Sequence, residues 1–188
     1  MRVVIDNWLS PGLLRAVAET WPDSTSHHWH AYNDRNSVKL ASRSWAGIPL
    51  AAQVAIMEMA KIDVGALLGV PDAFPDLDGL NGAGLHQMNA GGRLGLHLDA
   101  ERHPLRAWKR VASGVLYLEA CDGGSLEFCE HDGTVIERVE PRFNRLALFT
   151  CDQTWHRVTE CRSRRRSICL FWWEQSADCH GASSARFE

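Results

Sequence analysis

Short apolar runs separated by turn-forming residues make up the chain from residue 84 onward, and this pattern restricts the fold most. β-Branched, aromatic and leucine side chains favour strands, whereas glycine, proline and aspartate between them favour turns. Many short strands at close spacing are typical of an all-β barrel or sandwich. The strands predicted from these runs are 85–89, 94–99, 111–118, 125–129, 134–138, 145–150, 156–160 and 166–173.

The first 79 residues show a different pattern, with helical periodicity. Residues 3–9 predict a short strand, and Ser10 followed by Pro11 is typical of a helix start. Residues 13–21 then carry apolar side chains at helical spacing. Residues 23–46 are polar and irregular, so they predict loops rather than regular structure.

Two more helices are predicted between residues 49 and 69. Pro49 begins the first, and Asp63 caps a short second helix over 64–68 that Gly69 ends. The face of the first helix that we expect to pack consists of Leu50, Val54, Met57 and Lys61, with Ile56 and Met59 flanking it. These stripes indicate packing rather than a cofactor site.

The length and composition are those of one domain with a substantial core. The chain has 188 residues, of which 45% are hydrophobic. We expect residues 1–79 to support a core at 80–175, within the same domain, and 176–188 to form a flexible tail. The net charge of −3 makes nucleic acid an unlikely partner. No apolar run reaches the roughly 18–20 residues that cross a bilayer, so we expect no membrane association.

The cysteines and the N-terminal residues indicate in which cellular compartment we expect the protein. Six cysteines are present, and none form a Cys-x-x-Cys pair, so a zinc knuckle is not indicated. Several lie within apolar strand patterns, where a free thiol behaves as a small hydrophobe. Residues 1–6 become acidic too early for a signal peptide. We therefore expect a reduced, cytoplasmic protein, with a disulfide framework as the less favoured alternative.

A candidate metal site lies in the strand predicted at 94–99. His97 and Asp99 are two residues apart, and side chains at that spacing point to the same face of a strand. His156, at the start of another apolar strand, is the best candidate for a third ligand. Two histidines and one carboxylate suit Fe(II) with open positions for a co-substrate and O2. A second histidine cluster, at 27–30, is interpreted as a surface loop in preference to a metal site.

Two further polar residues fall within apolar strands. Arg166 alternates with Ile168 and Leu170, so it is predicted to point toward an interior, where a guanidinium needs a partner anion. Its planar fork matches a carboxylate bidentately. Tyr117 lies in another apolar strand and has a hydroxyl that donates either to the same carboxylate or, equally well, to backbone.

These motifs, in this order, resemble the 2-oxoglutarate/Fe(II)-dependent dioxygenases of the prolyl 4-hydroxylase type, in particular their small bacterial and phage members. The resemblance covers about half of the chain and includes the opening at 3–10. The segments that carry it are His-Leu-Asp at 97–99, Gly-Gly-Ser-Leu-Glu-Phe at 123–128, 139–149, Trp-His-Arg-Val at 155–158 and 166–172.

The resemblance implies a fold, a cofactor set and residue roles. The fold is a double-stranded β-helix, a jelly-roll of the cupin type, supported by the N-terminal helices. Fe(II) is held by His97, Asp99 and His156 and is chelated by 2-oxoglutarate, O2 is the second co-substrate, and ascorbate is a candidate additional cofactor. Arg166 and Tyr117 would bind the distal carboxylate of 2-oxoglutarate. The family's usual tyrosine before His-x-Asp is absent, and His86 or Met88 takes that position.

Three functions stay open at this point. The favoured one is a dioxygenase that hydroxylates a C–H bond and converts 2-oxoglutarate to succinate and CO2. The alternatives are a non-catalytic, metal-binding β-barrel module and a zinc hydrolase, since the same three ligands also suit Zn(II). The substrate groove is expected from loops at 23–46 and 100–110, which carry few motifs. A peptidyl proline, another peptide, a free amino acid and another small molecule therefore all stay candidate substrates, and the oligomeric state stays open.

Overall fold

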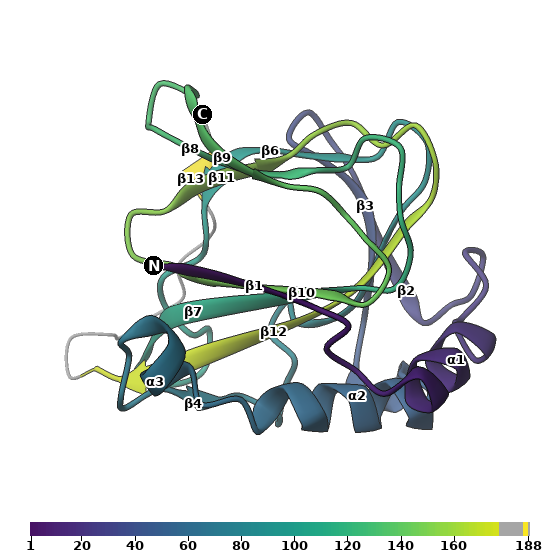
Figure 1. The fold of residues 1–188 in the computed structure, drawn as a ribbon, viewed down its shortest axis with the longest axis horizontal. Helices are drawn as coiled ribbons and strands as arrows, with labels where there is room; N and C mark the ends of the chain where they lie inside the picture. The colour runs from purple at the N-terminus through teal and green to yellow at the C-terminus, as the bar shows by residue number, and fades with distance from the viewer. Residues whose placement is uncertain (177–185, 188) are drawn as a thin grey trace.

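The strands predicted from residue 84 onward form the body of one curled antiparallel sheet (Figure 1). The structure is a computed structural model, and it describes residues 1–176 and 186–187. The strands of the core are β5 (Gly84–Met88), β6 (Arg93–Leu98), β7 (Trp108–Tyr117), β8 (Leu126–Cys129), β9 (Val135–Val139), β10 (Arg145–Thr150), β11 (Trp155–Val158) and β12 (Arg165–Gln175). Each of the eight predicted runs thus contains a strand, with small shifts at the ends.

The sheet curls so that two layers of strands face each other across an interior. Figure 1 shows β10, β7 and β12 below, with β1 (Arg2–Asp6) at their edge, and β6, β11, β8 and β9 above. β5 and β3 (Ser37–Ser42) connect the layers at one side. This arrangement confirms the predicted jelly-roll fold, in which side chains alternate between the interior and the outside of each layer.

Three helices cover the outer face of the lower layer (Figure 1). They are α1 (Pro11–Glu19), α2 (Leu50–Ala60) and α3 (Val64–Leu68), with a 3-10 turn at Trp45–Gly47. Asp63 caps α3 by accepting a hydrogen bond of 2.9 Å from the backbone N–H of Ala66, and Gly69 ends it at a φ of 73°. The predicted helix starts are confirmed to within one residue, and so is the Asp63 cap, whereas Ser10 occupies the N-cap position of α1 without a side-chain hydrogen bond.

The predicted packing face of α2 is wrong. Leu50, Val54 and Met57 are exposed, and the buried residues are Ala52, Ala55, Ile56 and Met59. The helix is apolar on nearly every side, so the spacing of its apolar residues did not single out one face. Ala52 and Ala55 allow the buried face of the helix to pack closely, and Ile56 and Met59 fill the rest of that interface.

Residues 23–46 were predicted as loops, and this is also corrected. They include β2 (Trp29–Asn33), which pairs with β3 to form a hairpin. β3 then pairs with β5 through Leu40 and Ala41 and with β6 through Ser37 and Val38. Most of β2 is exposed, so its polar composition reflects an outer strand rather than an irregular segment.

The remaining predictions concern the chain end and the membrane. A short β4 (Phe74–Pro75) pairs with β12, and β13 (Arg186–Phe187) pairs with His97 and Leu98 of β6. The rest of the tail predicted to be flexible, residues 177–185 and 188, lies outside the described residues. Within the described part of the chain, no helix is long and apolar enough to span a membrane.

The lower layer is buried on both of its faces. Its outer face packs against the helices and carries Leu116, Ile168, Leu170 and Trp172. Its inner face carries Val115, Tyr117, Phe149 and Cys169, which meet Leu126 and Phe128 of the upper layer. Strand β12 therefore has two apolar faces, as its sequence predicted, and only one of them looks into the interior.

Candidate active site

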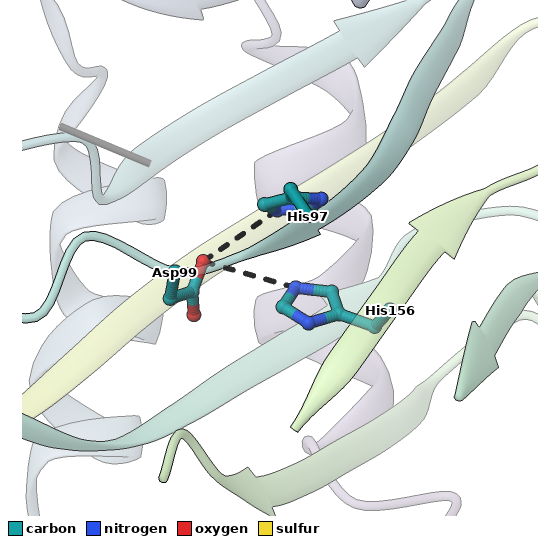
Figure 2. Close-up of side chains that lie close together, drawn as sticks. All are labelled: His97, Asp99 and His156. Atoms are coloured by element: carbon teal, nitrogen blue, oxygen red, sulfur yellow. Dashed lines mark ion pairs between the residues drawn. The ribbon is translucent and has the colours of Figure 1, made fainter. Parts of the chain in front are cut away.

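Three side chains from two adjacent strands meet inside the sheet. His97 is on β6, Asp99 follows the end of that strand, and His156 is directly opposite His97 in the antiparallel register. Figure 2 shows the three groups pointing toward one another. The Nε2 atoms of the two histidines each lie 3.7 Å from Asp99 Oδ1, and one ligand atom from each residue lies within 4.8 Å of the others.

Backbone hydrogen bonds fix the tautomer of both imidazoles. His97 Nδ1 lies 2.8 Å from the Gly95 carbonyl, and His156 Nδ1 lies 2.9 Å from the Thr154 carbonyl. A carbonyl oxygen only accepts, so each Nδ1 carries the proton and donates it. Each Nε2 therefore presents a lone pair to the centre of the triad, which is the state that binds a metal.

The carboxylate of Asp99 is also oriented, so that one of its oxygens faces the two histidines. Its Oδ2 accepts a hydrogen bond of 2.8 Å from Ser113 Oγ, while Oδ1 faces the histidines and lies 3.5 Å from a guanidinium nitrogen of Arg110. Burial favours the neutral acid, but the charge of Arg110 and the neighbouring histidines hold the pKa of Asp99 well below its usual range. The carboxylate is thus ionised at neutral pH.

His156 is neutral at physiological pH. Burial, and then the neighbouring His97, lowers the pKa of His156 to about 4. Two imidazoles with fixed lone pairs and one carboxylate fit a divalent metal of the first transition series, with positions left for exogenous ligands. The residues present therefore fit the implied Fe(II), and the three ligands predicted from sequence are brought together.

The triad opens into a cavity of about 470 Å³ between the two layers. The cavity walls come from β3, β5, β6, β7 and β12. At the rim, Phe187 of β13 stacks on His97 with ring centroids 5.3 Å apart. Tyr32 and Lys39 of the β2–β3 hairpin line the cavity, as the prediction of a groove from residues 23–46 anticipated.

The arginine in this cavity is Arg165 and not Arg166, which corrects the prediction. Arg166 lies on the outer face of β12, where it pairs with Glu119 at 3.0 Å. Arg165 lines the cavity, is 3% exposed and has its guanidinium 4.9 Å from the centre of the Tyr117 ring. Arg166 does alternate with Ile168 as predicted, but that face contacts the helices. Alternation gave two buried faces without showing which one is the interior.

Tyr117 and His86, the other predicted co-substrate contacts, both lie near Arg165. Tyr117 is wholly buried, and its hydroxyl has no hydrogen-bond partner among the described residues. Burial raises the pKa of Tyr117, against the opposing charge of Arg165, so it stays a neutral donor. His86 lines the cavity, but its Nε2–H donates to the Gly82 carbonyl at 2.8 Å. His86 therefore forms part of the wall and has no free N–H in this tautomer.

Three charged residues of the cavity were missed from the sequence as site residues. Arg165 was passed over because its strand begins one residue earlier than predicted. Lys39 lies within residues 23–46, which were predicted as loops but include the strand β3. Arg110 precedes the strand predicted at 111–118, and simple alternation from that strand assigns it to the wrong face.

A jelly-roll sheet that encloses two histidines and a carboxylate defines a metal-dependent enzyme of the double-stranded β-helix class. Residues 83–174, about half of the chain, match the family model described as the 2OG-Fe(II) oxygenase superfamily. The chain belongs to this superfamily and is a 2-oxoglutarate- and Fe(II)-dependent oxygenase, which confirms the resemblance seen in the sequence. Its family uses Fe(II), 2-oxoglutarate and O2. No curated protein matches the chain.

Solved structures with the same fold include several prolyl hydroxylases. A prolyl-4-hydroxylase from Pseudomonas putida is 21% identical with a TM-score of 0.68, covering 94% of this chain and 93% of its own. A prolyl hydroxylase from Trichoplax adhaerens, in complex with a hypoxia inducible factor peptide fragment, is 17% identical with a TM-score of 0.67, covering 92% and 83%. The viral collagen prolyl hydroxylase of Paramecium Bursaria Chlorella virus-1 is 13% identical with a TM-score of 0.62, covering 92% and 95%. At these identities the likeness establishes the fold.

Proposed function

We propose that the protein hydroxylates a C–H bond of a small molecule or peptide and converts 2-oxoglutarate to succinate and CO2. The observation that carries this proposal is one cavity that holds the His97, Asp99 and His156 triad together with a buried arginine, Arg165, that has no carboxylate partner among the described residues. A ligand with a metal-chelating end and a free carboxylate at the other end satisfies both features.

Each residue of this arrangement has a role in the proposal. His97, Asp99 and His156 would hold the iron, and the bound iron would supply activation of O2 and oxidation of the substrate. Arg165 would receive the distal carboxylate of 2-oxoglutarate through paired hydrogen bonds. The unpartnered hydroxyl of Tyr117 would donate to the same carboxylate, so that its burial no longer leaves a polar group unsatisfied.

The proposed substrate class follows from the fold. The fold is shared with prolyl hydroxylases, one of which was solved with a peptide, so a prolyl residue or another amino-acid-like group is the starting proposal. A hydrolytic zinc site would leave the buried charge of Arg165 without a purpose, as would a non-catalytic module that binds only a metal. The described cysteines are free, which supports the proposed cytoplasmic location, and ascorbate stays a proposed additional cofactor.

Anaerobic titration of the Fe(II)-loaded protein with 2-oxoglutarate tests this function, followed by measurement of succinate after O2 is admitted. We expect a visible metal-to-ligand charge-transfer band and succinate formation in the wild type, and neither in His97→Ala. His27→Ala is the matched control, because His27 is exposed and lies in the cluster interpreted as a surface segment. Wild-type turnover in His97→Ala, or metal binding with no charge-transfer band in the wild type, would contradict the proposal.

A further inference from the structure

A second buried arginine reaches the cavity because of a β-bulge. In the pairing of β12 with β7, Phe171 is opposite Ser113 and Trp172 is opposite Ala112, but Trp173 is opposite Arg110. Val111 is therefore the extra residue on β7, and Arg110 takes the inward-facing position that Val111 would otherwise occupy. Bulges next to active sites commonly redirect a side chain in this way.

Arg110 is held rigidly in that position. Its guanidinium lies 3.7 Å from the centre of the Phe171 ring and 4.9 Å from that of Trp173. The residue is 6% exposed, it lines the cavity, and its Nε has no hydrogen-bond partner among the described residues. Its one anionic neighbour is Asp99, at 3.5 Å. Stacking on two aromatic rings fixes the plane of the fork while leaving N–H groups for a ligand.

With the metal ion and 2-oxoglutarate bound, the anionic groups of the site do not balance the charge of Arg110. A divalent ion is balanced by Asp99 and the metal-binding carboxylate of 2-oxoglutarate, and Arg165 is balanced by the distal carboxylate. Arg110 is then left without an anion of its own. Lys39 is in the same situation, because no described carboxylate forms an ion pair with its ammonium group, which lies 5.3 Å from the centre of the Tyr32 ring. Burial lowers the pKa of Lys39, as expected of an ammonium group with no neutralising partner.

The co-substrate does not reach both arginines. The guanidinium of Arg165 lies over the Tyr117 ring and that of Arg110 over the Phe171 ring, and Tyr117 pairs with Ser167, four residues before Phe171 on β12. Four residues of strand span about 13 Å, which is longer than a five-carbon diacid. Arg165 therefore marks the 2-oxoglutarate end of the cavity, and Arg110, 3.5 Å from Asp99, lies toward the other end, where we place the primary substrate.

We propose that Arg110, assisted by Lys39, forms a second anion site that binds a carboxylate of the primary substrate. This rests on the proposed function, since it assigns one anion to 2-oxoglutarate and the other to the molecule that is hydroxylated. The substrate is then a carboxylate-bearing compound, either a free amino acid or other small acid, or a peptide that presents a terminal or side-chain carboxylate. An uncharged internal peptide segment leaves Arg110 and Lys39 unbalanced in a buried site.

Calorimetric titration of the Zn(II)-loaded protein, saturated with 2-oxoglutarate, tests the site with benzoate and benzamide as probes. The two differ in charge and little in shape. We expect benzoate to bind the wild type at least tenfold more tightly than benzamide, and Arg110→Gln to remove that preference. Arg106→Gln is the matched control, because this arginine is close in sequence but outside the cavity, and it should keep the preference. Equal binding of the two probes to the wild type, or a preference that survives in Arg110→Gln, would overturn the proposal.

A second variant and a separate readout keep the outcomes distinct. Lys39→Met should weaken benzoate binding severalfold without disturbing the Asp99 contact, so it decides the question if Arg110→Gln binds metal poorly. Binding of 2-oxoglutarate is measured first, and its absence in the wild type would contradict the proposed function rather than the second anion site. Succinate release with free amino acids, compared with acidic and amidated peptides, then identifies the source of the carboxylate.

Discussion

Arg165 and Arg166 are adjacent in sequence, yet they lie on opposite faces of β12 in opposite electrostatic surroundings. Arg166 pairs with Glu119 at 3.0 Å, donates to the Ala18 carbonyl at 3.4 Å and lies over the Trp21 ring. Arg165 donates a hydrogen bond of 3.4 Å to the Ser167 hydroxyl and lies over the Tyr117 ring. No carboxylate of the described chain pairs with it.

The difference teaches which buried charge belongs to the fold and which is kept for a ligand. A buried cation without an anion costs free energy, so it persists where a function requires it. Arg166 has its partner within the protein and joins β12 to α1. Arg165 has none, and we infer that its partner arrives with the co-substrate. The same reasoning applies to Arg110 at the other end of the cavity.

The largest expected effect is on 2-oxoglutarate affinity, which should depend on Arg165 and hardly on Arg166. Arg165→Gln should weaken 2-oxoglutarate binding by about 100-fold to 1000-fold, since removing one partner of a buried charge pair costs about 2–5 kcal/mol. Arg166→Gln should change it by less than about threefold. Anaerobic calorimetry on the metal-loaded proteins measures both, and a larger effect in Arg166→Gln would reverse the comparison.

The buried histidines of the cavity should also make the stability of the protein depend on pH. The pKa of His156 is about 4 in the folded protein, against 6.5 for an ordinary histidine. Between pH 6.5 and 4 the unfolded chain therefore binds a proton that the folded chain does not, so stability falls as the pH falls, by about 3 kcal/mol. His86, whose pKa is also lowered by burial, adds in the same direction.

Chemical denaturation of the metal-free protein at several pH values measures this effect. His156→Gln should show a correspondingly shallower loss of stability between pH 6.5 and 4, with the contribution of His86 retained. His27→Ala, at an exposed position, is the control and should follow the wild type. An unchanged slope in His156→Gln would mean that the imidazole is protonated in the folded protein.

The two arginines should also affect stability with opposite signs. In the protein without metal or 2-oxoglutarate, Arg165→Met should raise the free energy of unfolding by about 1 kcal/mol, because it removes a buried charge that has no partner. Arg166→Met should lower it by about 1–2 kcal/mol, because it leaves Glu119 with a weaker partner. Urea denaturation compares the variants, and destabilisation by Arg165→Met would show that its charge is already satisfied.

The smallest effect is expected for the third arginine of this run. Arg164 pairs with the same Glu119 at 3.1 Å, but its side chain is 54% exposed. Arg164→Gln should change stability by less than about 0.5 kcal/mol and leave 2-oxoglutarate binding unchanged, because exposed ion pairs contribute little. The same denaturation and calorimetry measurements apply. A loss as large as that of Arg166→Met would place the structural role on the exposed pair instead.

The sequence by itself determined the core strands from residue 84 onward and the candidate metal ligands. Strand periodicity and turn residues are local properties, so 145–150 coincides with β10 and the other core strands shift only at their ends. The spacing of His97 and Asp99 fixed their common face for the same reason. His156 followed from side-chain chemistry and from the order of the motifs, and the structure places it opposite His97.

Only the tertiary structure decided which charged residues enter the cavity. β12 is apolar on both faces, so the choice between Arg165 and Arg166 depended on which face the helices cover. Arg110 depended on one extra residue in the pairing with β12, and Lys39 on the insertion of β3 between β5 and β6. Each of these outcomes is set by contacts between distant segments. Local side-chain patterns do not encode which partner a buried face will meet.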